Sequence, residues 1–344
     1  MGRTPMRRSM APSLRRARIA VASIVAALAV VALPSLAGAA SVAYIDGGEV
    51  WVSSLDGAQK ARLSGGEGNW QNVAASDGGR VAAVQREPSQ ISQTSTFRVW
   101  EAGGATAYNG ALSAVSGYQS YAYPLSFDIS ADGGFLVYGF SASNTFPTPS
   151  FTGGFYARSV DNVALAPIEV SNATYPSFAG SRVVAAFGSE VRLQDPSAVP
   201  FGTQFNFWIN TSGTGLQLRR TDVAANGTLV ASELHSDTTD KISILSVSGL
   251  GGALTGAVDC FLPTVGPAKD VSISQDATRI AWKDDQGVKV AGVPTSSACV
   301  LSPAPVVISA TGTSPSIGGA NLAGLPPGSG GDARAREPPQ CRVI

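Results

Sequence analysis

Apolar residues recur along this chain in pairs of short stretches separated by a polar turn. Before the turn they alternate with polar residues, as in Leu125, Phe127 and Ile129, which is the period of a half-buried β-strand. After the turn they are continuous, as in residues 135–138, which is typical of a strand covered on both faces. Most of the turns contain Asp-Gly, Asn-Gly or Gly-Gly, which tolerate positive φ and favour tight hairpins, and the others contain the related pairs Ala-Gly and Asp-Ala. The pattern predicts a series of two-stranded hairpins.

The hairpin pattern occurs six times in one frame. The copies read AASDGGRVA, DISADGGFLV, PSFAGSRVV, VAANGTLVA, ISQDATRIA and PSIGGANLA, and their turn residues are Asp77, Asp132, Ala179, Asn226, Asp276 and Gly318. These anchors are 55, 47, 47, 50 and 42 residues apart. A repeat of about 40–50 residues built from strands is the signature of a β-propeller blade.

Three columns of the frame support stacked blades. The position two before the anchor is always small, the position four after it is always aliphatic, and the position five after it is always Ala or Val. Small residues are needed where sheets converge on an axis, whereas a β-sandwich with ordinary hairpins would not need the same columns six times. The sequence therefore predicts an all-β fold, a six-bladed β-propeller with four-stranded antiparallel blades.

A third strand follows five of the six hairpins, and the chain ends predict how the ring closes. These third strands are expected at residues 97–99, 155–157, 191–193, 242–245 and 288–290. The sixth, residues 49–52, precedes the first anchor, while no third strand follows Gly318. We therefore expect N-terminal strands within residues 41–63 to complete the blade that the C-terminus begins, leaving no open sheet edge.

The first 39 residues predict export. They carry six Arg and no acidic residue, and an apolar run over residues 19–33 ends at Pro34 before a small-residue cleavage site. The run of 15 residues is short for a membrane span, although an uncleaved anchor is the alternative. Arg15-Arg16 raises a twin-arginine route, but Arg18 stands where that signal prefers an apolar residue. We expect a signal peptide (1–39), a secreted or periplasmic location, and no membrane span after cleavage.

Charge and length define the rest of the chain. Removing residues 1–39 lowers Lys plus Arg from 24 to 18 and leaves Asp plus Glu at 24, a net charge of −6 that argues against nucleic-acid binding. Residues 40–325 fill six blades with no room for a second domain, and we also expect the propeller to be a monomer. Residues 326–344 are rich in Pro, Gly and charge and are expected to be disordered.

Export permits a Cys260–Cys299 disulfide, but equivalent positions on neighbouring blades should lie too far apart, so free thiols remain the alternative.

The repeat resembles that of the TolB-like, WD40-like β-propellers of secreted and periplasmic bacterial proteins. That frame is Ser-Pro-Asp-Gly, a basic residue and Ile-Ala-Phe; residues 274–282 (SQDATRIAW) match it best, residues 76–82 (SDGGRVA) also match, and residues 51–57 (WVSSLDG) resemble its third strand. The Pro is absent from all copies, and the Ala179 and Gly318 copies lack the Asp. The resemblance implies a propeller with a binding or scaffolding role and supplies no catalytic residue.

Candidate chemistry is sparse. His235 is the only histidine, and without a Gly-x-Ser-x-Gly elbow it is best interpreted as a solvated loop residue. Asp128 and Asp222 share the column four before the anchor, and we interpret this column as facing the central channel. The two carboxylates would then hydrate the channel or hold a cation or polar ligand. Alternatively, they would act as the paired carboxylates of a polysaccharide hydrolase or lyase. Glu233 with nearby acids could bind Ca²⁺, but a solvated hairpin is the simpler interpretation, and no cofactor is predicted.

Aromatic residues give the strongest surface signal. They gather in the loops on either side of the second hairpin's continuous strand, at Tyr118, Tyr121, Tyr123, Phe146 and Phe151. In an up-and-down blade both loops open at the same end of the channel, where such side chains could bind a partner or pack against each other. The sequence thus favours a secreted, non-enzymatic module that binds a protein or another cell-envelope component. The alternative is a carbohydrate-active propeller that uses the channel carboxylates.

Overall fold

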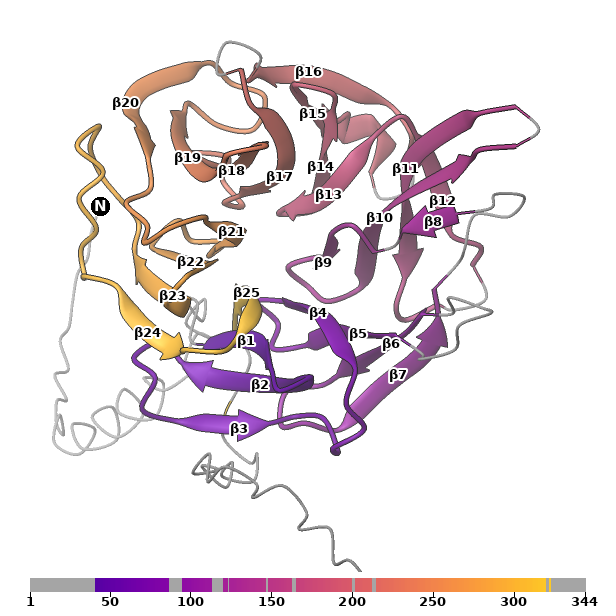
Figure 1. Cartoon of the computed structure of the whole chain (residues 1–344), viewed down its shortest axis with the longest axis horizontal. Coiled ribbons are helices and arrows are strands. Elements are labelled where there is room, and N and C mark those ends of the chain that lie inside the picture. Colours follow the sequence, from indigo (N-terminus) through magenta and orange to yellow (C-terminus); the bar gives the residue numbers. More distant parts are fainter. Residues whose placement is uncertain are drawn as a thin grey trace, which may run out of the picture. The chain divides into compact units, whose positions relative to one another are not determined.

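The chain forms a ring of six β-sheets around a central axis (Figure 1). The computed structural model describes residues 41–86, 95–112, 120–122, 124–146, 148–162, 165–199, 202–211, 215–319 and 322, with the side chains of 120–122 excepted. The predicted signal peptide and C-terminal tail lie outside these residues. Within them, no helix has the length and apolar character needed to cross a membrane.

The first three blades follow one another along the chain. Blade 1 contains β4 (Trp70–Ala75), β5 (Val81–Arg86), β6 (Ser95–Trp100) and β7 (Thr106–Ala111). Blade 2 contains β8 (Ser120–Ala122), β9 (Phe127–Ile129), β10 (Phe135–Asn144), β11 (Ser150–Ser159) and β12 (Ile168–Ser171). Blade 3 contains β13 (Thr174–Ala179), β14 (Arg182–Phe187), β15 (Glu190–Gln194) and β16 (Phe205–Asn210), with a short 3₁₀ turn, η1 (Pro196–Ala198), between the last two.

The last three blades complete the ring. Blade 4 contains β17 (Gln217–Val223), β18 (Leu229–Ser236), β19 (Thr239–Val247) and β20 (Leu254–Phe261). Blade 5 contains β21 (Lys269–Ile273), β22 (Arg279–Asp284), β23 (Gly287–Gly292) and β24 (Val306–Ser309). Blade 6 joins β25 (Thr313–Gly318) to β1 (Ser41–Asp46), β2 (Glu49–Ser54) and β3 (Lys60–Arg62). All pairings are antiparallel, so the predicted six-bladed propeller is confirmed.

Ring closure is also confirmed, with one correction. β1 pairs with β25, with Ser41 opposite Gly318, so the N-terminus supplies three of the four strands in this blade. The repeat frame placed Leu322 in the second strand of that blade, but β1 occupies this position and Leu322 lies outside any strand. The C-terminus therefore contributes one innermost strand only among the described residues.

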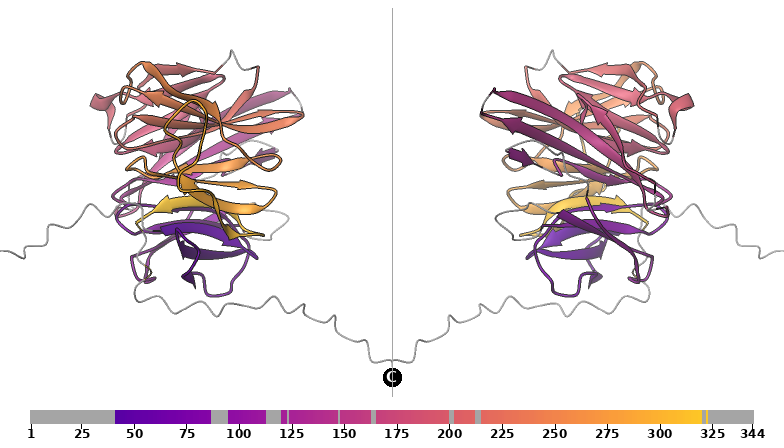
Figure 2. Two further views of the ribbon diagram at one scale, coloured as in Figure 1. Left: turned by 90° about the vertical axis from the view of Figure 1, so that its left-hand side faces the viewer. Right: turned by 90° about the vertical axis from the view of Figure 1, so that its right-hand side faces the viewer.

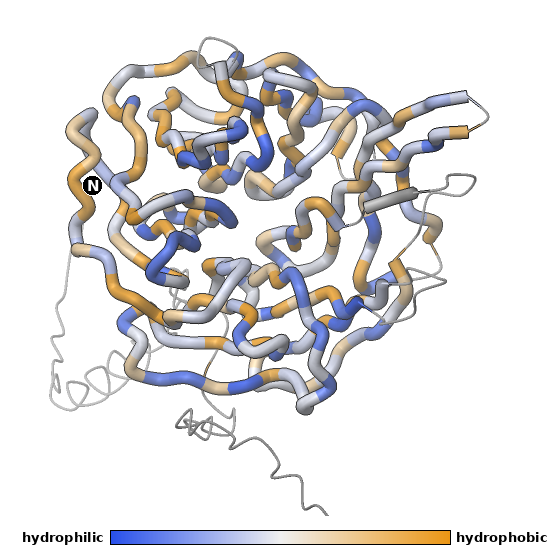
Figure 3. Tube along the Cα trace, in the orientation of Figure 1, coloured by the Kyte–Doolittle hydropathy of each residue, from blue (hydrophilic) through white to orange (hydrophobic). Residues whose placement is uncertain are grey.

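The core lies between neighbouring blades. Each apolar cluster combines residues of adjacent sheets, such as Trp282 of blade 5 with Ile242 of blade 4. The Ala-or-Val column is buried as predicted at its five described positions, with Ala82, Val137, Val184, Ala231 and Ala281 all at 0% exposure, while Ala323 lies outside the described residues. Figure 3 shows hydrophobic stretches recurring in the strands of the ring, which is the apolar pattern seen in the sequence.

Blade 2 departs from the four-stranded plan. β10 and β11 pair over ten residues each, compared with eight for the corresponding β18–β19 hairpin of blade 4. β9 pairs with Leu136–Tyr138 at one end of β10, and β8 pairs with Ser141–Ser143 farther along the same edge. The β10–β11 hairpin extends outward past the rim of the ring (Figures 1 and 2).

A disulfide joins blades 4 and 5, which settles the alternative left open by the sequence. Cys260 lies on β20 and Cys299 in the connection between β23 and β24, and their Cα atoms are 5.7 Å apart. Because Cys299 is in a connection rather than on a strand, it can approach the outer strand of the neighbouring blade. The bond is compatible with an oxidising compartment.

Candidate functional site

The two channel aspartates fasten neighbouring blades together. Asp128 on β9 accepts hydrogen bonds from the N–H groups of Ile129 (2.9 Å) and of Phe178 on β13 (2.7 Å). Asp222 on β17 accepts from Val223 (3.0 Å) and from Ile273 on β21 (2.7 Å). Each carboxylate therefore uses one oxygen for its own innermost strand and the other for the innermost strand of the next blade.

Serines complete this ring of hydrogen bonds. Ser272 Oγ accepts from Ile317 N–H (3.1 Å), and Ser316 Oγ accepts from Ala75 N–H (2.9 Å). Innermost strands have a free edge toward the axis, and unpaired buried N–H groups are costly. One N–H at or next to the end of the innermost strand has a side-chain acceptor in all six blades, at Ala75, Ile129, Phe178, Val223, Ile273 and Ile317.

This ring corrects the sequence frame. The structurally equivalent positions are Ala74, Asp128, Ser177, Asp222, Ser272 and Ser316, whereas the frame had placed Val73, Tyr175 and Ser314 in the column of Asp128. The inner turns differ in length, since Ala179 pairs with Arg182 across only two residues in blade 3. A frame anchored on turn residues therefore shifts in blades 1 and 3, and in blade 6 no turn joins β25 to β1 to anchor it.

Burial shapes the electrostatics at the axis. Burial, with a contribution from the charge of Asp222, raises the pKa of Asp128 to about 7. Burial likewise raises the pKa of Asp222, and Arg220 opposes both shifts. Since both oxygens of each carboxylate already accept backbone N–H groups, this arrangement favours a structural role over the paired-carboxylate chemistry of a glycosidase.

Blade 4 contains a further buried acid where a solvated hairpin was expected. Glu233 on β18 is 7% exposed and accepts a hydrogen bond from Asp270 N–H (2.8 Å). Burial, followed by the charge of Asp270, raises the pKa of Glu233 to about 7. Arg220 lowers the pKa of these acids, but its buried Nε has no hydrogen-bond partner among the described residues. No sequence pattern marks Arg220 as a site residue.

No metal centre forms from the acids near His235. Within the described residues, no three His, Cys, Asp or Glu side chains are arranged to hold a metal ion. His235 lies on β18 rather than in a loop, its side chain is 22% exposed, and its Nδ1 is hydrogen-bonded to Asp240 Oδ1. The prediction of a solvated loop histidine was therefore wrong, because the β18–β19 hairpin continues farther than its polar sequence indicated.

Of the predicted aromatic residues, Phe146 and Phe151 lie on the long hairpin of blade 2. Phe146, between β10 and β11, and Phe151, at the start of β11, are each 74% exposed. Tyr121 lies on β8 opposite Ala142, so the tyrosine segment and the hairpin do come together through the backbone. The hairpin points away from the axis (Figure 1), rather than over the channel as expected. Tyr118, Tyr123 and the side chain of Tyr121 lie outside the described residues.

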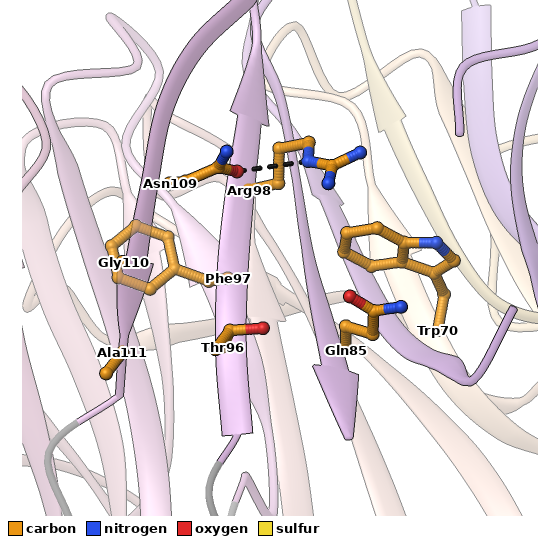
Figure 4. A pocket seen from close by; sticks show the side chains of 8 residues that line it. All are labelled: Trp70, Gln85, Thr96, Phe97, Arg98, Asn109, Gly110 and Ala111. Carbon is orange, nitrogen blue, oxygen red and sulfur yellow. Dashed lines mark hydrogen bonds between the residues drawn. The ribbon is translucent and has the colours of Figure 1, made fainter. Parts of the chain in front are cut away.

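Blade 1 contains a cavity that the sequence did not predict. Its volume is about 370 Å³, and all four strands of the blade contribute to its walls (Figure 4). The lining residues are Trp70, Gln85, Thr96, Phe97, Arg98, Asn109, Gly110 and Ala111. The only sequence signal for it is the alternation of side chains along the two strands, which puts Thr96 and Arg98 on one face of β6. In the β6–β7 hairpin, Thr96 pairs with Ala111 and Arg98 with Asn109.

Solved structures share the fold at low sequence identity. TolB from Acinetobacter baumannii is 12% identical with a TM-score of 0.50, over 81% of this chain and 66% of that protein, so the match spans just under two thirds of TolB. A candidate 6-phosphogluconolactonase from Bacteroides fragilis is 10% identical (TM-score 0.46; 78% and 95% coverage), and the Swd1 β-propeller domain of Myceliophteria thermophila is also 10% identical (0.43; 79% and 88%). No protein-family model and no curated protein matches the chain. The TolB-like resemblance is confirmed for the fold, and these identities carry no statement about activity.

Proposed function

We propose that this chain is an exported, non-enzymatic binding propeller whose partner-binding element is the β10–β11 hairpin. The observation that carries the proposal is the exposure of Phe146 and Phe151, at 74% each, on a hairpin that extends from the ring. Burying an exposed Phe side chain in an interface stabilises the complex by about 1.5–3 kcal/mol. Exposed aromatic side chains of this kind are common anchors of protein interfaces.

The backbone of the hairpin supports the same role. β12 pairs only with Gly154–Ala157 of β11, and Asn172 N–H reaches Gly153 O (2.8 Å), so no strand in the described part of the chain pairs with the outer edge of residues 150–152. Residues 141–153 carry no charged side chain that would repel an approaching strand. An uncharged, extended segment of a partner protein could add to this edge and bury Phe151.

Two features support export and binding over catalysis. The Cys260–Cys299 disulfide agrees with the predicted signal peptide, since disulfides persist in oxidising compartments. The carboxylates that would serve a hydrolase are engaged with the backbone of neighbouring blades.

The test is capture of cell-envelope proteins by the wild-type chain and by a Phe146→Ser/Phe151→Ser variant. We expect at least a tenfold loss of the captured partner with an unchanged melting temperature, because both side chains are exposed. The matched control is Phe207→Ser on β16, an equally surface-located Phe at 59% exposure, which should retain capture. Equal capture by the hairpin variant and wild type would sink the proposal.

A further inference from the structure

The cavity of blade 1 is built on one face of the sheet. Gln85, Thr96 and Ala111 lie side by side across β5, β6 and β7, and Arg98 and Asn109 form the next row of the same face. Trp70 of β4 closes one side, as Figure 4 shows. Ala111 leaves the space open because its side chain ends at Cβ.

Arg98 is held rigidly in this cavity and its charge is balanced. Its Nη1 forms an ion pair with Glu67 Oε1 (2.6 Å), and its Nε donates to Asn109 Oδ1 (3.0 Å). The guanidinium carbon lies 5.2 Å from the centre of the Trp70 ring and 5.6 Å from that of Trp100. The hydrogen bond from Arg98 holds the pKa of Glu67 below its usual range. A phosphate or carboxylate would have to compete with Glu67, so the cavity is suited to an uncharged ligand.

The remaining polar atoms both donate and accept. Gln85 Nε2 is fixed by Gly68 O (2.9 Å), which leaves its Oε1 as an acceptor. The Oδ1 of Asn109 already accepts a hydrogen bond from Arg98, so the Nδ2 of Asn109 is the atom left to donate to a ligand. The Thr96 hydroxyl has no hydrogen-bond partner among the described residues, so it can donate or accept. Figure 4 shows the Gln85 oxygen and the Thr96 hydroxyl turned toward each other, with the Trp70 ring beside them.

We propose that this cavity binds a neutral sugar unit. Vicinal hydroxyl groups both donate and accept, which matches two oriented amides and a hydroxyl, while the C–H groups of the ring suit the apolar wall of Trp70. The volume of about 370 Å³ is within the range of small-ligand sites. The site is separate from the hairpin proposed for protein binding, so it can fail or succeed independently.

Saturation-transfer NMR on the full chain tests this proposal with glucose, galactose, mannose and N-acetylglucosamine, alongside glucuronate and glucose 6-phosphate as anionic counterparts. At least one neutral sugar should bind saturably and more tightly than the anionic pair. Ala111→Leu, which fills the cavity at an exposed position, should weaken it at least tenfold. Ala107→Leu, exposed on the same strand but outside the cavity, is the matched control and should leave binding unchanged.

A second variant, which removes a polar contact without filling the cavity, separates loss of a contact from loss of the fold. Asn109→Ala should weaken the sugar about fivefold or more without changing the melting temperature, because Asn109 is exposed. The proposal is overturned if no neutral sugar in the panel binds, if glucuronate or glucose 6-phosphate binds more tightly, or if binding survives Ala111→Leu. The proposal would also be overturned if an uncharged peptide, rather than a sugar, bound to this cavity and lost its binding in the Ala111→Leu variant.

Discussion

At the scale of single residues, two aspartates do most of the fastening at the propeller axis. Asp128 and Asp222 supply acceptors for four of the six N–H groups in the ring, because a carboxylate can serve its own strand with one oxygen and the neighbouring strand with the other. This explains why Ala74 can occupy the equivalent position in blade 1: the Ile129 N–H that it faces is already bonded to Asp128. An unsatisfied buried N–H would cost about 1–3 kcal/mol.

The raised pKa of Asp128 makes stability depend on pH. Its folded value of about 7 lies above the ordinary value of 3.8, so the folded state binds the proton more tightly than the unfolded state. The resulting stabilisation is full below about pH 4 and is lost as the pH rises through about 7. In urea unfolding between pH 4.5 and 8, the midpoint should therefore fall as the pH rises, and Asp128→Asn should reduce this dependence.

Two other buried acids and one control variant determine how the pH dependence of the urea midpoint is interpreted. Asp222 and Glu233 also have raised pKa values, so Asp128→Asn should reduce the slope without abolishing it. Asp237→Asn changes an exposed aspartate on the β18–β19 turn and should leave the slope as in the wild type. Identical slopes for Asp128→Asn and wild type would contradict the assignment.

At the scale of strands and hairpins, the sequence predicted what the turns and the apolar periodicity determine. The third strands at residues 97–99 and 242–245 are confirmed as parts of β6 and β19, because apolar runs between polar turns have few other ways to be buried. The register of blades 1, 3 and 6 was wrong: the inner turns of blades 1 and 3 are shorter than those of blades 2, 4 and 5, and no turn joins β25 to β1 in blade 6. The reach of β10 and β11 was not predicted either, because Ser, Thr and Asn in residues 141–145 do not distinguish an extended hairpin from a loop. The cavity of blade 1 depends on side chains from four strands, which no local pattern brings together.

The disulfide between β20 and the β23–β24 connection should stabilise the fold. The two cysteines are 39 residues apart, and closing such a loop in the unfolded chain corresponds to about 4 kcal/mol by chain entropy. The Cys260→Ser/Cys299→Ser variant should therefore unfold at lower urea, and dithiothreitol should destabilise the wild type but not this variant. Cys341→Ser, in the predicted tail, is the control and should behave as the wild type. A double variant as stable as the wild type would show that the bond contributes nothing.

At the scale of the whole molecule, the ring has one joint that no chain connection crosses. β25 and β1 come from opposite ends of the sequence, and only non-covalent contacts hold them together. Ser41 Oγ donates to Gly318 O (3.1 Å), and Asp46 accepts from Ser309 Oγ (2.6 Å) and Thr311 Oγ1 (2.8 Å). Ile317 also packs in a cluster with Tyr44, Ala281 and Val288, which belong to blades 5 and 6. β25 thus pairs with β1 of its own blade and also packs against blade 5.

Removing residues 313–344 should therefore abolish cooperative folding rather than loosen one blade. Without β25, β1 loses its partner along an entire edge, Ala75 and Ser272 lose their hydrogen-bonding partners in the axial ring, and the cluster around Ile317 opens to water. Thermal melting followed by near-ultraviolet circular dichroism should show no sharp transition for this truncation. Removal of residues 326–344 alone is the matched control and should preserve the transition, because β25 is retained. A cooperative transition in the longer truncation would mean that five blades can stand without the closing strand, and that the joint between the two ends of the chain is dispensable.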